Sequence, residues 1–224
     1  MEYTLHFEVV LRKLPLFLGG LGVTAYFAVL AMFFGIIIGL FGALARRSKN
    51  RIAYSISTAY VELMRNTPLL IQMYLFYFGL TELGIPMGNY LAFALAISIN
   101  NGAYCTEIIR AGLEGIHKTE IEAALGLGLS YPQTMIFVVF PHVFKIIYPP
   151  VCNQLILIIL VTSLASFLGI RELTGVAREW DALHFRPIET YTVVMYLYVA
   201  ITIAAMALLV FLGNKLLKVK IKVF

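Results

Sequence analysis

Long uncharged stretches dominate the sequence. Residues 14–45, 83–106, 146–170 and 190–214 carry no charge, and residues 52–81 carry only two charged side chains. A helix needs about 20 mostly apolar residues to cross the hydrocarbon core of a bilayer. The pattern therefore predicts five membrane-spanning helices, at about 21–45, 56–80, 88–112, 147–169 and 190–214.

A sixth uncharged stretch, residues 123–144, is a poorer candidate for a membrane span. It is interrupted by Gly126, Gly128, Pro132, Pro141 and His142. A proline inside a helix costs about 3 kcal/mol unless the freed carbonyl finds another partner. We therefore expect this stretch to belong to the connection between the third and fourth spans.

The composition agrees with a membrane protein. Hydrophobic residues make up 61% of the chain and charged residues 13%, with a mean hydropathy of +0.88, whereas a soluble domain carries about 25% charged residues. This excludes an ordinary cytosolic globule, a disordered segment and a disulfide scaffold. The two cysteines and four histidines lack the spacing of a metal site, so we expect no metal or cofactor in this chain. The prediction is an all-α membrane protein with one domain over residues 1–224.

The basic residues predict the orientation. With five spans, eleven Lys and Arg residues fall on one side and five on the other, and the positive-inside rule places the richer side in the cytoplasm. The N-terminus is then outside and the C-terminus inside. We also expect no cleaved signal peptide, because the first residues begin with an acid rather than a basic segment. These basic patches are expected to contact anionic lipid headgroups rather than nucleic acid.

Glycines recur along one face of the first span, at Gly35, Gly39 and Gly42. Small residues allow helices in lipid to approach closely. The pattern predicts tight packing here, either within one chain or between two chains.

The connection before the fourth span contains the segment HKTEIEAALGLGLS, residues 117–130. Thr119 and Glu122 have the spacing of a capping box, and Gly126 and Gly128 limit the helix at its other end. We predict a short cytoplasmic helix at about 119–130. From the residues alone, a docking element and a surface-lying helix are equally compatible with this pattern.

Charged residues within spans are functional candidates by default. Glu62 with Arg65, and Glu107 with Arg110, are three residues apart and can pair on one helix face. We expect both pairs to hold helices together near the cytoplasmic end, with a role in gating or in contact with the substrate as the alternative. Pro68 is expected to kink the second span, which leaves the Met64 carbonyl in need of another partner.

Uncharged polar residues near the predicted membrane midplane are candidates for contacts with a solute. They could bind the ammonium and carboxylate of an amino acid, or could hydrogen-bond neighbouring helices. They are Asn100, Asn101 and Tyr104 in the third span, and Thr162, Ser163 and Ser166 in the fourth.

Four ordered blocks of sequence resemble a known family. Glu122-Ala123-Ala124, Gly128, Val138 and Pro141 resemble the EAA signature of permease subunits in binding-protein-dependent ABC importers, with Val138 in place of its Ile. The segments RNTPLL (residues 65–70) and NNGAYCTEIIRAG, and the residues around Thr162 and Glu172, are similar to the polar amino acid branch. Many relatives have a Lys and then an acid or Asn just before Thr162, where this chain has Leu160 and Val161.

The resemblance implies a five-helix type I ABC importer (MetI-like) bundle in the bacterial cytoplasmic (inner) membrane. It implies a second permease subunit (an identical or a different chain), two separate ATPase subunits and an extracytoplasmic amino acid-binding protein. This chain would not be an enzyme, since no GxxxxGK[ST] segment is present. The residues implied in coupling to the ATPase are Glu122, Ala123, Ala124, Leu125, Gly128 and Ser130.

Two other interpretations remain open at this stage. One is a permease for another small solute, such as methionine, a dipeptide or an ion. The other is a membrane scaffold or receptor without transport activity, which would need no ATPase partner. A membrane enzyme is disfavoured because no converging catalytic set is evident.

Overall fold

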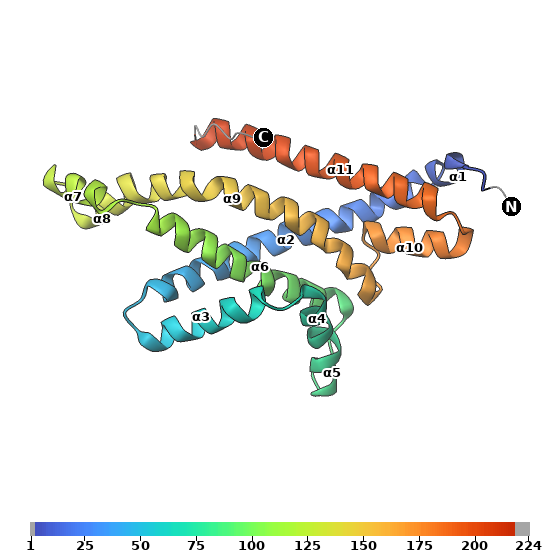
Figure 1. The fold of residues 1–224 in the computed structure, drawn as a ribbon, viewed down its shortest axis with the longest axis horizontal. Helices are drawn as coiled ribbons and strands as arrows, with labels where there is room; N and C mark the ends of the chain where they lie inside the picture. Colours follow the sequence, from blue (N-terminus) through green and yellow to red (C-terminus); the bar gives the residue numbers. More distant parts are fainter. Residues whose placement is uncertain (1–2, 218–224) are drawn as a thin grey trace. The chain divides into compact units, whose positions relative to one another are not determined.

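The computed structural model describes residues 3–217, and every regular element in this part of the chain is helical (Figure 1). Short helical elements lie between longer ones. In chain order the elements are α1 (Phe7–Leu11), α2 (Leu14–Arg47), α3 (Arg51–Arg65), α4 (Leu69–Tyr74), η1 (Leu75–Gly79), α5 (Leu80–Glu82), α6 (Asn89–Glu114), α7 (Lys118–Gly126), α8 (Tyr131–Thr134), η2 (Met135–Val139), α9 (Phe140–Val161), η3 (Thr162–Leu168), α10 (Leu173–His184), α11 (Pro187–Leu212) and η4 (Gly213–Leu217).

The chain divides into two compact units. Unit 1 comprises Met1–Phe33, Thr67–Ser98 and Leu155–Met206, and unit 2 comprises Phe34–Asn66, Ile99–Gln154 and Ala207–Phe224. Each unit draws its residues from several helices that are far apart in the sequence. Three of the basic residues used to predict the orientation, Lys218, Lys220 and Lys222, lie outside the described residues.

Three helical stretches of the described chain are long and apolar enough to cross a membrane. They are Leu14–Arg47, Tyr131–Leu168 and Pro187–Lys215. They overlap the first, fourth and fifth predicted spans, and α6 covers the third. The number of spans and their membrane boundaries remain predictions.

The second predicted span is not one continuous helix, and the expectation of a simple kink was wrong. Helix α3 ends at Arg65, and α4 begins at Leu69 after Pro68, whose backbone is extended (φ −62°, ψ 134°). Pro68 disfavours helical geometry in the residue before it and lacks an N–H group. The chain therefore starts a new helix instead of bending the old one.

The helix that contains the fourth predicted span begins before that span, at Tyr131 rather than near residue 147. A π-helical turn over Met135–Val139 precedes Pro141, and the Phe140 N–H bonds the Met135 carbonyl five residues back. This wider turn gives room to the proline ring, which would otherwise clash with the preceding turn. Pro141 therefore lies inside a continuous helix.

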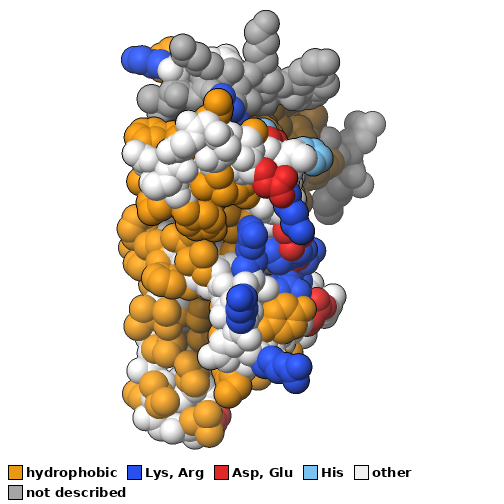
Figure 2. Space-filling view, turned by 90° about the vertical axis from the view of Figure 1, so that its left-hand side faces the viewer, with side chains coloured by type: hydrophobic (Ala, Val, Ile, Leu, Met, Phe, Trp, Pro, Cys, Tyr) orange, Lys and Arg blue, Asp and Glu red, His pale blue; other side chains and the backbone are white. Residues whose placement is uncertain are grey.

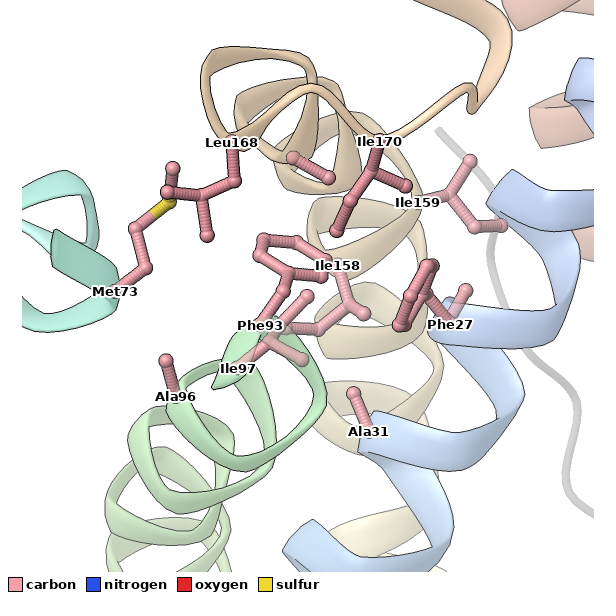
Figure 3. Close-up of a cluster of buried hydrophobic side chains, with 12 residues drawn as sticks. Phe27, Ala31, Met73, Phe93, Ala96, Ile97, Ile158, Ile159, Leu168 and Ile170 are labelled. Atoms are coloured by element: carbon pink, nitrogen blue, oxygen red, sulfur yellow. The ribbon is translucent and has the colours of Figure 1, made fainter. Parts of the chain in front are cut away.

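The core of unit 1 is a cluster of buried apolar side chains from α2, α4, α6, α9 and the segment after it (Figure 3). Phe27 and Phe93 are at its centre and meet edge to face, with ring centroids 5.0 Å apart. The cluster holds residues 155–161 of α9 and the start of η3 in place. Side chains from these two segments line a groove in unit 1. Its remaining buried members are Ala28, Ala31, Met73, Ala96, Ile97, Ile158, Ile159, Ala165, Leu168 and Ile170.

In unit 2, the glycine face of α2 packs against α6. A β carbon on Gly35 would collide with the Asn101 side chain, and one on Gly39 would lie 2.5 Å from the Cβ of Cys105. Gly42 faces Thr106 in the same way. Of the two alternatives open from sequence, these glycines serve packing within one chain, because the space in front of them is filled by α6.

Candidate functional site

The predicted cytoplasmic helix is α7, Lys118–Gly126. His117 occupies the N-cap position with extended backbone (φ −69°, ψ 137°), and no side chain caps the helix. The expected capping box of Thr119 and Glu122 was therefore wrong. The helix begins before Thr119, so Thr119 lies within the first turn and cannot occupy the N-cap position.

A glycine ends α7. Gly128 has φ +88°, the Gly128 N–H bonds the Leu125 carbonyl at 3.0 Å, and the Leu129 N–H bonds the Ala124 carbonyl at 3.2 Å. This pair of bonds is the Schellman arrangement, which requires left-handed backbone at the residue after the cap. Glycine adopts that conformation without the steric penalty of a β carbon. The expected role of Gly128 in ending the helix is confirmed.

One face of α7 is exposed. Glu122 and Ala123 are exposed, Leu125 is 41% exposed and Leu127 is 83% exposed, whereas Ala124 is buried at 5%. A short helix with an apolar tip and a carboxylate on its open face presents a surface that another protein can cover.

A contact with α9 holds α7 in place. Nδ1 of His142 on α9 lies 2.8 Å from the Glu120 carboxylate on α7. Ser130 begins α8 through a capping box, because its backbone N–H donates to Gln133 Oε1 at 2.8 Å. Ser130 therefore caps the next helix and is not part of α7.

The Glu107 carboxylate, on α6 in unit 2, is surrounded by three arginines. Arg110 Nη2 lies 2.9 Å away, Arg65 Nη1 lies 3.9 Å away, and Arg46 donates a hydrogen bond from α2. Figure 2 shows Lys and Arg side chains (blue) gathered with Asp and Glu (red) on the face that it views. The Glu107 cluster thus ties α2, α3 and α6 together within unit 2.

Of the two predicted ion pairs, Glu107 with Arg110 is confirmed, and Glu62 with Arg65 is wrong. Arg65 turns to Glu107 instead, and the Glu62 carboxylate accepts from Asn66 Nδ2 at 2.9 Å. The Glu107 side chain is only 20% exposed, so its charge is less screened by water and attracts arginines more strongly than the exposed Glu62 does. Arg46 was missed by sequence reasoning because it lies on another helix.

The polar residues predicted in the third span bond neighbouring helices within unit 2. Asn100 Nδ2 donates to the Met64 carbonyl at 3.0 Å. This is the carbonyl freed by Pro68, and its need for another partner is confirmed. Asn101 is fully buried and its Oδ1 accepts from Gln154 Nε2 at 2.9 Å. The Tyr104 ring lies under the Arg65 guanidinium, 5.4 Å from it.

The polar residues predicted in the fourth span all lie in η3, within unit 1. Thr162 donates to the Ile159 carbonyl and Ser163 to the Leu160 carbonyl, each at 2.7 Å. The Ser166 carbonyl accepts from Arg178 Nη1 at 3.0 Å. Thr162 is fully buried, whereas Ser163 and Ser166 line surface pockets.

Ser163 opens onto a groove of about 490 Å³ in unit 1, which we call the α9–α11 groove. The groove combines an apolar lining with three hydroxyl groups. It is lined by Ile156, Leu160, Ser163, Met195, Tyr198, Val199 and Thr202.

Behind the groove, Tyr198 donates a hydrogen bond to a buried carboxylate, Glu172, at 3.1 Å. Glu172 is fully buried and caps the N-terminus of α10 by accepting from the backbone N–H groups of Thr174 and Gly175 at 2.8 Å each, and it also accepts from Thr24 on α2 at 3.4 Å. Burial raises the pKa of Glu172 to about 7, although these hydrogen bonds oppose the shift. Sequence reasoning noted Glu172 only as part of a family block. Glutamate is not among the residues preferred at an N-cap, so the local sequence did not indicate this role.

Comparison with known proteins identifies the family. Residues 17–223 match the family described as "Binding-protein-dependent transport system inner membrane component". The chain belongs to this family of permeases. It is 34% identical to the "Probable amino-acid ABC transporter permease protein YckA" of Bacillus subtilis, over 89% of this chain and 88% of the relative. It is 35% identical to the "Glutamine transport system permease protein GlnP" of Escherichia coli, over 85% of this chain and 88% of the relative.

A solved structure described as an "amino acid ABC transporter with histidines" has the same fold as this permease. The TM-score is 0.89 and the identity 32%, with 96% of this chain and 100% of the other covered. The predicted fold class, an all-α permease of the type I importer kind, is thereby confirmed. A multi-pass location in the inner membrane follows from the family and from the apolar helices.

Proposed function

We propose that this permease carries polar amino acids into the cell, driven by ATP hydrolysis on a separate subunit. The observation that carries the proposal is the family match over nearly the whole chain, together with relatives whose names specify amino acid, glutamine and arginine transport. Permeases for other solutes and scaffolds without transport activity fit these relatives less well.

Coupling to ATP hydrolysis is assigned to α7. Its exposed face, with Glu122, Ala123, Leu125 and Leu127, is the part that a cytoplasmic ATPase subunit would cover. The Schellman end at Gly128 and the contact of His142 with Glu120 support this role, because a helix that transmits movement must be fixed to the helices that it moves.

The proposed assembly contains two ATPase subunits, an extracytoplasmic binding protein and a second permease subunit, either identical to this chain or different. The N-terminus lies outside and the C-terminus in the cytoplasm. The bias of basic residues supports this orientation. A reporter fused to the C-terminus is expected to behave as cytoplasmic, and an external signal would refute the orientation.

Crosslinking tests the coupling assignment. Ala123→Cys in the assembled transporter is expected to crosslink to a cysteine placed in the ATPase subunit. Leu183→Cys on α10 is the matched control, because Leu183 is 75% exposed but lies between the fourth and fifth predicted spans, which the proposed orientation places outside. If Ala123→Cys never crosslinks under conditions in which the complex hydrolyses ATP, the coupling assignment fails.

Transport is tested with the complete complex in proteoliposomes, supplied with its binding protein and ATP. We expect ATP-dependent accumulation of a polar amino acid, and no accumulation when the ATPase subunit is inactivated. ATP-dependent uptake of another solute class, with no amino acid transported, would overturn the proposal.

A further inference from the structure

Each of the three hydroxyl groups that line the α9–α11 groove donates its hydrogen bond to another group of the protein. Ser163 donates to the Leu160 carbonyl at 2.7 Å, and Thr202 donates to the Tyr198 carbonyl at 2.9 Å. A carbonyl oxygen can only accept, so each of these hydroxyls must donate its proton in these bonds. Tyr198 donates to the Glu172 carboxylate, and its oxygen in turn accepts from the Thr174 hydroxyl at 2.9 Å. The Ser163 and Thr202 oxygens keep lone pairs that can accept, so the groove offers hydrogen-bond acceptors to a ligand.

The carboxylate behind Tyr198 has no positive partner. Within residues 3–217, no Lys, Arg or His nitrogen lies within 4.0 Å of Glu172, whose partners are two backbone N–H groups and the hydroxyls of Thr24 and Tyr198. Buried charges in proteins are ordinarily paired, because an isolated one is costly to desolvate. When ionised, Glu172 places negative charge behind the groove that is stabilised by the N-terminus of α10 but not neutralised by a cationic side chain of residues 3–217.

The walls of the groove suit a flexible aliphatic chain. Ile156, Leu160, Met195 and Val199 supply apolar surface between the acceptor groups. A long side chain with a charged end buries its methylene groups on such a surface while its end meets polar atoms. A ligand carboxylate in the same place would meet only hydrogen-bond acceptors and would be repelled by the negative charge of Glu172.

We infer that the α9–α11 groove binds the positively charged side chain of a basic amino acid, with Tyr198 linking the groove to Glu172. The aliphatic part of the side chain lies on the apolar wall, and its cationic end faces the hydroxyl oxygens. This inference deepens the proposed function and rests on it, since it names the substrate class of an amino acid importer.

Arginine and citrulline form a matched pair of ligands, because they differ in charge but hardly in size. The complete complex, purified without the binding protein, is titrated with each by calorimetry. We expect arginine to bind at least about tenfold more tightly than citrulline, since a hydrogen bond to a charged group contributes about that factor. Equal affinities, or no arginine binding, would overturn the inference.

Tyr198→Phe removes the link and leaves the Glu172 cap of α10 in place. We expect it to weaken arginine binding about tenfold and to change citrulline binding less than about twofold. Tyr196→Phe is the matched control, because Tyr196 is on the same helix, is 65% exposed and does not line the groove. Equal losses for both ligands in Tyr198→Phe would indicate a structural role and refute the inference.

The pH profile provides a readout that a structural role would not change. The groups facing Glu172 are Thr24 on α2, Thr174 and Gly175 on α10, and Tyr198 on α11, and none of these is charged. Because the pKa of Glu172 is about 7, arginine affinity is expected to fall several-fold from pH 8 to pH 6, and Glu172→Gln is expected to abolish that fall. An unchanged pH profile in Glu172→Gln would overturn the inference.

The substrate class can fail while the proposed function holds. ATP-dependent uptake of glutamine or another uncharged amino acid, with no binding of arginine, would remove this inference alone. Absence of uptake of any amino acid would remove the proposed function as well.

Discussion

Gly39 on α2 faces Cys105 on α6 so closely that a β carbon on residue 39 would lie 2.5 Å from the Cβ of Cys105. Cβ atoms in proteins do not approach to that distance, so the two helices can keep this separation only with glycine at position 39. Gly35 and Gly42, on the same face of α2, approach side chains of α6 equally closely.

Gly39→Ala is expected to force α2 and α6 apart and to lower the free energy of unfolding by about 1–3 kcal/mol. Thermal unfolding of the purified protein in detergent measures the change. Gly22→Ala is the matched control, because it lies on the same helix with nothing within 4 Å of the added carbon. Equal stability of the two variants would contradict the packing described.

Gly128→Ala is expected to distort the end of α7, because residue 128 has φ +88° and a β carbon in left-handed backbone costs about 1–2 kcal/mol. ATP-dependent uptake should fall, while the amount of protein in the membrane changes little. Gly126→Ala serves as the control. Gly126 lies within the helix with open space around it, so alanine there should leave transport unchanged or stabilise α7 slightly. A larger loss from Gly126→Ala than from Gly128→Ala would refute the assignment.

Glu107→Gln leaves Arg46, Arg65 and Arg110 close together without their shared carboxylate. We expect a loss of about 1–3 kcal/mol in the free energy of unfolding, as for hydrogen bonds to charged groups. Glu62→Gln should change the same quantity by less than about 0.5 kcal/mol, because Glu62 is exposed and bonds only Asn66 within the described chain. Chemical denaturation in detergent would compare the two variants.

Stability is expected to fall as pH rises through 7. The pKa of Glu172 is about 7 in the folded chain, against an ordinary value of 4.5, so the folded state binds more protons than the unfolded state between these values. Integration of this difference gives about 1 kcal/mol more stability at pH 6 than at pH 8. Thermal unfolding at both pH values should reveal the difference, and Glu172→Gln should lose it.

Ser130→Ala removes the hydroxyl at the N-cap of α8 and is expected to cost about 1 kcal/mol. Thr119→Ala should have little effect, because the N-cap of α7 is His117. The two substitutions each remove a hydroxyl near the start of one of two successive helices, and thermal unfolding separates their effects. A larger effect from Thr119→Ala would restore the sequence-based assignment of the cap.

The site could be predicted in part. The order of residues 122–128 was enough to locate α7 and to indicate that Gly128 ends it, because backbone conformation depends on local sequence. Pro68 similarly indicated that the Met64 carbonyl needs another partner. The identity of that partner, Asn100, is a contact between residues 36 positions apart, which no local rule specifies.

By itself, the sequence determined the helical class, the apolar character of the long helices and the family, since these follow from composition, periodicity and ordered motifs. The tertiary structure alone decided that Arg65 pairs with Glu107, that the α2 glycines pack against α6, and that Glu172 lies behind Tyr198. Each of these depends on which faces of distant helices meet. The helix faces that meet are those that leave the least unpaired buried charge and the least empty space in each packed unit. This depends on the whole unit, so it cannot be read from one segment of the sequence.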